Sequence, residues 1–67
     1  MIFNIETERE TDGRWIAEIA DMPGVLAYGE SEDAARANAY ALALRVIADQ
    51  VEKSKSLPKA IEVATSA

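Results

Sequence analysis

Glycine and proline are confined to a few places in this 67-residue chain, and their distribution divides it into two parts. The three glycines and one of the two prolines lie between Gly13 and Gly29, whereas residues 30–57 contain neither residue type. Both residue types interrupt regular structure and are typical of turns. The first part is therefore predicted to consist of short segments joined by turns, and the second part of one long helix.

Two strands joined by a hairpin are predicted for residues 1–10 and 14–20. Both segments alternate polar and apolar residues, which is the pattern of a strand with one buried face. Asp12 and Gly13 stand between them, and an Asp-Gly pair is a strong hairpin signal because the turn requires a positive φ. The residues predicted to share one face are Phe3, Ile5 and Thr7 in the first strand and Trp15, Ala17 and Ile19 in the second.

A turn at Asp21-Met22-Pro23-Gly24 is predicted to lead into a third strand over residues 25–29. Proline sets φ for the second position of a turn, and glycine accepts a conformation that other residues avoid. The third strand is expected to place Val25 and Ala27 on one face and Leu26 and Tyr28 on the other.

One long helix is predicted over about residues 32–53, a stretch rich in alanine. The Ser31 hydroxyl can cap its free amides, and Glu32 and Asp33 lie at the positive end of its dipole. Lys53 lies at the negative end, where a cation is favourable.

A loop over residues 54–58 and a short strand over about residues 60–64 are predicted to complete the chain, because the residue before Pro58 is disfavoured in a helix. The order is then β-β-β-α-β. This order indicates a single small α+β domain over residues 1–67, with a three-stranded antiparallel meander, one long helix and a short C-terminal strand.

The predicted helix carries two apolar stripes when its residues are placed at 100° intervals. A helix packed on one sheet needs only one stripe, so the second is predicted to be a partner or oligomer interface, with burial inside the same domain as the alternative. Trp15 and Tyr28 are further interface candidates, although core packing is the favoured interpretation for Trp15. The first stripe is Ala35, Ala39, Leu42 and Val46, and the second is Tyr40, Leu44, Ile47 and Val51.

The small size of the chain favours a partner, and its acidity is compatible with one. Of its 33 hydrophobic residues 13 are alanine, which buries little area, and chains of this size gain only about 3–5 kcal/mol from one core. The formal net charge is −5, and residues 1–33 hold nine acidic and two basic residues. Such a charge disfavours direct nucleic-acid binding. A solvated acidic surface is the favoured interpretation of it, and a basic partner is the alternative.

Catalysis, cofactors and metals are not predicted. The chain has no Cys or His, which excludes disulfides, Cys/His zinc sites and histidine acid-base chemistry. A magnesium-dependent nuclease would need converging carboxylates, and no spacing among Asp12, Asp21, Asp33 and Asp49 singles out such a set. No signal peptide or membrane span is recognised, so a soluble cytoplasmic protein is expected.

Four segments of the sequence form an ordered set along the chain. They are the run Asp12 to Ile19, the turn around Asp21, Pro23 and Gly24, the segment Gly29-Glu30-Ser31, and an alanine-rich helix with Asn38-Ala39 in it. This ordered set resembles HicB-type antitoxins of type II toxin-antitoxin systems, over about residues 1–50. Ala20, Met22 and Val25 depart from the residues common in that family.

The resemblance implies a partial RNase H-like fold and an antitoxin that binds a HicA-like toxin. Such toxins are small basic ribonucleases that cut mRNA with a histidine, and the antitoxin would mask their RNA-binding and catalytic surface. The resemblance also implies a homodimer or higher oligomer. Residues 57–67 are too few for the C-terminal DNA-binding domain that many HicB proteins carry. The alternatives are an orphan homo-oligomeric regulatory or structural domain of the same fold and, ranked below it, a magnesium-dependent nuclease.

Overall fold

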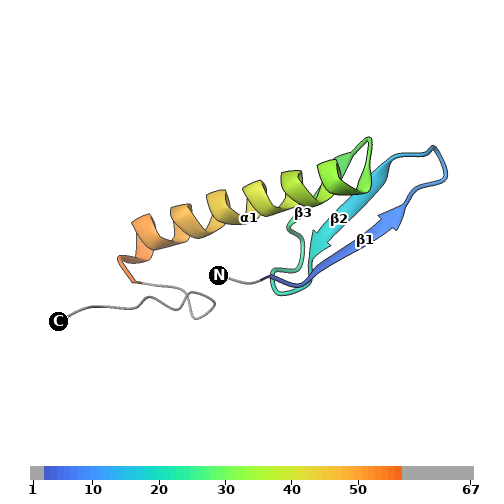
Figure 1. Cartoon of the computed structure of the whole chain (residues 1–67). Helices are drawn as coiled ribbons and strands as arrows, with labels where there is room; N and C mark the ends of the chain where they lie inside the picture. Colours follow the sequence, from blue (N-terminus) through green and yellow to red (C-terminus); the bar gives the residue numbers. More distant parts are fainter. Residues whose placement is uncertain (1–2, 57–67) are drawn as a thin grey trace.

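The computed structural model describes residues 3–56, which form a three-stranded antiparallel sheet with one helix packed across one face (Figure 1). The elements are β1 (Ile5–Arg9), β2 (Trp15–Ile19), β3 (Leu26–Gly29) and α1 (Glu32–Ser54), and the sheet order is β1-β2-β3. The prediction of three antiparallel strands followed by one helix is confirmed. The strand predicted over residues 60–64 lies outside the described residues.

The hairpin between β1 and β2 closes around the predicted glycine. Gly13 has φ 93°, and its N–H donates to the carbonyl oxygen of Glu10 at 3.0 Å. The N–H of Glu10 donates to the carbonyl oxygen of Arg14 at 2.7 Å, which leaves three residues in the loop, one of the common hairpin lengths. This closure sets the register, in which Thr7 pairs with Ala17.

The β2-β3 connection contains the predicted proline-glycine turn. The N–H of Val25 donates to the carbonyl oxygen of Met22 at 3.0 Å, so Pro23 and Gly24 are the two central residues. Gly24 has φ 89°, as the third position of a type II turn requires. Asp21 joins this turn to the start of the chain, because its carboxylate accepts the Asn4 N–H at 2.8 Å.

The helix begins and ends close to the predicted residues. The Ser31 hydroxyl accepts the Ala34 N–H at 3.1 Å, so the predicted N-cap is confirmed. The helix ends one residue later than predicted, at Ser54. Lys55 adopts a left-handed conformation with φ 58° and donates its N–H to Val51, which closes the last turn.

The core lies between α1 and the inner face of the sheet. Its buried members are mostly alanine, which lets the helix backbone approach the strands closely. Half-buried larger residues, among them Trp15 and Phe3, pack around it. The fully buried residues of the cluster are Ala17, Ile19, Ala35, Ala39 and Ala43.

The buried residues of the helix form one line that curves around the helix axis. The sequence predicts two stripes parallel to the axis. The line runs through Ala35, Ala39, Ala43 and Ile47 at steps of four. Four residues turn a helix by about 40° more than one revolution, so three such steps rotate the line by about 120°. It therefore starts on the first predicted stripe and ends on the second, a course expected where a helix crosses a twisted sheet.

Candidate partner-binding surfaces

The helix side of the molecule carries the four residues predicted as an interface, and the structure divides them. Ile47 is only 5% exposed, and Tyr40 is half-buried with its ring packed against Phe3 at a centroid distance of 5.4 Å. Leu44 is 39% exposed and Val51 is half-buried. Within residues 3–56, only Leu44 of this set presents a large open apolar surface.

The helix is longer than the sheet that supports it. Its 23 residues span about 34 Å, whereas five-residue strands span about 17 Å. Figure 1 shows the C-terminal half of α1 running past the end of the strands. Leu44 and Val51 lie in this half, so the predicted interface stays a prediction for these two residues and for part of Tyr40.

Trp15 and Tyr28, the other two interface candidates, lie on opposite faces of the sheet. Trp15 is half-buried against the core, which agrees with its favoured interpretation. Tyr28 is 43% exposed on the outer face, and the Arg14 guanidinium lies 4.6 Å from the centroid of its ring. This cation–π contact joins the hairpin to β3.

The turn around Asp21, Pro23 and Gly24, which belongs to the resemblance to HicB-type antitoxins, stabilises the fold. Asp21 accepts a hydrogen bond from Asn4, and Pro23 and Gly24 form the turn into β3. Asp21, Pro23 and Gly24 are all exposed.

The outer face of the sheet is a second surface, and of its residues only Tyr28 was predicted to lie at an interface. Side chains at alternate positions of each strand point away from α1, and the register places them in two rows across the three strands. The rows are Glu6–Glu18–Leu26 and Glu8–Ile16–Tyr28.

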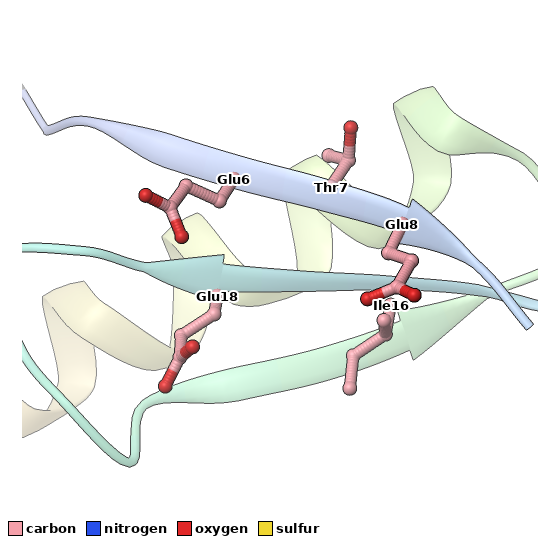
Figure 2. Close-up of a pocket in the computed structure, with 5 residues that line it drawn as sticks. All are labelled: Glu6, Thr7, Glu8, Ile16 and Glu18. Atoms are coloured by element: carbon pink, nitrogen blue, oxygen red, sulfur yellow. The ribbon is translucent and has the colours of Figure 1, made fainter.

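Carboxylates dominate the β1 side of this outer face. Glu6 and Glu18 are direct cross-strand partners, and Glu8 pairs with Ile16. Figure 2 shows these four side chains on the same side of the sheet, whereas Thr7 points the other way. The Thr7 hydroxyl donates to the Glu32 carboxylate at 2.7 Å, which ties the inner side of β1 to the start of α1.

Apolar side chains dominate the β3 side of the same face. Leu26 is 36% exposed beside Glu18, and Tyr28 lies beside the half-buried Ile16. The outer face is therefore a mixed surface, acidic along β1 and apolar along β3, with Ile16 in the middle.

The hollow on this face is too small to indicate a small-molecule site. Glu6, Thr7, Glu8, Ile16 and Glu18 line a volume of about 210 Å³, and pockets for small ligands usually measure about 300–1,000 Å³. Among residues 3–56 no three acidic side chains are grouped so that they could hold a metal ion.

Within residues 3–56, most carboxylates of the sheet half of the chain, residues 1–33, form no ion pair. In the described part of the chain the ion pairs are Asp12–Arg14 at 2.8 Å and Asp49–Lys53 at 3.1 Å. Of the nine carboxylates in residues 1–33, only Asp12 is paired with a cation that lies within residues 3–56. Hydrogen bonds from the Arg14 backbone and then from its side chain lower the pKa of Asp12.

The sequence contains a signal for the outer face. Glu6 and Glu8 occupy alternate positions of β1, Ile16 and Glu18 occupy alternate positions of β2, and a hairpin centred on Asp12 brings the two sets together.

No helix in residues 3–56 combines the length and the apolar composition that crossing a membrane requires. Comparisons with protein-family models, with curated proteins and with solved structures found no match for this chain.

Proposed function

We propose that this protein is a HicB-like antitoxin that binds and neutralises a small, basic, HicA-like toxin. The observation that carries the proposal is the unbalanced negative charge of the sheet half, where eight of nine carboxylates form no ion pair within residues 3–56. A basic RNA-binding surface is complementary to such a field, which speeds association and selects the partner.

The mode of action in this proposal is obstruction. The antitoxin occupies the toxin's RNA-binding and catalytic surface in the cytoplasm and carries out no reaction of its own. The ordered resemblance to HicB proteins supports it, and so does the use of that family's turn and helix-start residues as a turn and an N-cap. The proposed fold is a partial RNase H-like domain, which includes the strand predicted over residues 60–64.

An inhibition assay with a purified cognate HicA-like toxin tests the proposal. The expected result is a stable complex in size-exclusion chromatography and loss of mRNA cleavage at equimolar antitoxin. Raising the salt concentration is expected to weaken the complex, because ionic strength screens exposed charges. Full cleavage in the presence of a large excess of this protein would contradict the proposal.

Self-association is the second candidate, and the open apolar surface of Leu44 favours it. In this case the protruding half of α1 closes a homodimer. Sedimentation of the pure protein at several concentrations tests it. A dimer that Leu44→Glu leaves intact does not use this surface, and a monomer at all concentrations rules out the homo-oligomer.

A further inference from the structure

The outer face of the sheet has an arrangement that stability alone does not explain. Glu6 and Glu18 lie directly opposite each other on neighbouring strands, and like charges in that position destabilise a sheet. A long hydrogen bond of 3.4 Å from the Gly24 N–H to the Glu18 carboxylate offsets part of this cost. Beside them, Leu26 and Tyr28 expose large apolar surfaces to water. Departures from local stability rules that cluster on one surface are typical of functional sites.

We infer that this face is a docking surface for a basic segment of a partner protein. Arginine or lysine side chains of the partner lie over Ile16 and reach the carboxylates of Glu6, Glu8 and Glu18. Apolar side chains of the same segment cover Leu26 and Tyr28. The inference rests on the proposed function, because the partner that it assigns to this surface is the basic toxin.

Charge complementarity selects this occupant. A cation placed among the three glutamates offsets the repulsion between Glu6 and Glu18, and this relief makes the free energy of binding more favourable. Arginine is the most suitable cation, because its fork of donors binds carboxylates in pairs. One side of the Tyr28 ring is already covered by the Arg14 guanidinium of this chain.

The same charges argue against a second copy of this chain. An isologous contact through the outer face would bring the three glutamates of one copy toward those of the other, and the chain already carries a net charge of −5. The two rows also contain no basic residue that could pair with them across such a contact, and Arg14, which lies over Tyr28, is already paired with Asp12. Phosphate groups of a nucleic acid are repelled for the same reason.

The first experiment maps the surface without using the toxin. Backbone amide chemical shifts of the full chain are followed during titration with a short peptide in which arginine alternates with leucine, and with a control peptide in which glutamate replaces arginine. Saturable shifts are expected for the arginine peptide at Ile16, Glu18 and Tyr28. Shifts that are absent, or that follow every carboxylate of the chain alike, would overturn the inference.

The second experiment compares two variants with the same change in net charge. Glu6→Gln with Glu18→Gln removes two carboxylates from the outer face, and Glu30→Gln with Glu52→Gln removes two exposed carboxylates from elsewhere. For the outer-face pair we expect toxin affinity to fall about tenfold or more, and for the control pair less than about threefold. The outer-face pair is also expected to melt at a higher temperature, so weaker binding cannot be attributed to unfolding.

The outcomes separate the docking surface from the proposed function. If the toxin is inhibited and both variant pairs weaken binding equally, the docking surface is wrong and the antitoxin function stands. If the arginine peptide maps to the outer face and the toxin is not bound at all, the docking surface stands and the antitoxin function is wrong.

Discussion

The inner face of the sheet carries buried apolar side chains, whereas the outer face mixes carboxylates with exposed apolar side chains, although the same three strands supply both. On β2, Ala17 and Ile19 are fully buried against α1, whereas Ile16 and Glu18, their neighbours in the sequence, face outward. Packing against the helix limits the inner residues to sizes that fit between two backbones. The outer residues have no such limit, and among them the structure holds like charges together and leaves apolar surface open.

The two faces are expected to differ most in their sensitivity to truncation. Ile19→Ala removes a fully buried side chain and should reduce the free energy of unfolding by about 2–5 kcal/mol. Ile16→Ala makes the same chemical change on the outer face of the same strand and should cost no more than about 1 kcal/mol. Urea unfolding followed by circular dichroism measures both values.

A domain this small has little stability to lose, so Ile19→Ala can leave too little folded protein to measure. Ile19→Val then replaces it, with an expected cost of about 0.5–1.5 kcal/mol. Equal losses for Ile16 and Ile19 variants would show that the two faces do not differ in packing.

The second prediction concerns the close approach of β3 to α1 on the inner face. A Cβ on Gly29 would lie 2.4 Å from the backbone nitrogen of Ala35 and 2.8 Å from the backbone carbon of Ala34. Gly29→Ala is therefore expected to lower the free energy of unfolding by about 1–3 kcal/mol, measured by urea unfolding.

The control for this prediction is Glu30→Ala, one residue along the chain at an exposed position, which should change stability little. Because backbone atoms cause the clash, adding Ala35→Gly is not expected to rescue Gly29→Ala. A rescue would mean that side-chain crowding at Ala35 causes the loss.

The third prediction concerns the outer face, where a substitution is expected to raise the free energy of unfolding and not to lower it. Glu18→Gln removes the repulsion between Glu6 and Glu18 and should raise the free energy of unfolding by about 0.2–1 kcal/mol, because the amide oxygen of glutamine can still accept the Gly24 N–H. The gain should shrink as salt is added. A double-mutant cycle with Glu6→Gln isolates the pair, and additive effects of the two substitutions would contradict a direct interaction.

The smallest effect is expected at the hairpin, which belongs to neither face. Folding lowers the pKa of Asp12 because the Arg14 backbone N–H, and then its side chain, hydrogen-bond to the carboxylate. A lowered folded pKa adds stability above the unfolded pKa, and this stability is lost as the pH falls through the folded pKa. Asp12 is exposed, so the loss in acid should be slight.

Carboxyl-carbon NMR titration measures the pKa of Asp12 directly. In the wild type it should titrate below the ordinary range of an aspartate. In Arg14→Gln the pKa should rise only partly, because the backbone donor is the larger cause and remains in place. A full return to the ordinary value would assign the whole effect to the guanidinium.

Local signals predicted the elements and the turns between them. The first strand is shorter than predicted, because residues 3 and 4 are not part of it and β1 begins at Ile5. Asp12 and Gly13 marked the hairpin, Pro23 and Gly24 marked the second turn, and Ser31 marked the start of the helix. Each of these residues acts through its own φ or through a hydrogen bond to a near neighbour, so short stretches of sequence contain the information. The helix ends one residue after its predicted end. Lys55 adopts the left-handed conformation that closes the helix, and because it is not a glycine the sequence does not mark this position.

The candidate surfaces were less predictable, because they depend on contacts between distant residues. The second apolar stripe was predicted as an interface, but Ile47 is buried and Tyr40 packs against Phe3. A count of apolar residues on a helix gives two possible inner sides and does not choose between them. Only the crossing of α1 over the sheet makes that choice.

By itself, the sequence determined a meander of three strands, one capped helix and a strongly acidic first half, because turn chemistry, periodicity and charge are local properties. The tertiary structure decided which residues lie together. It wound the buried line from Ala35 to Ile47, brought the backbone of Gly29 against the helix, and placed Glu6 opposite Glu18. These pairings depend on register and on the packing angle between helix and sheet, which no single segment of the chain specifies.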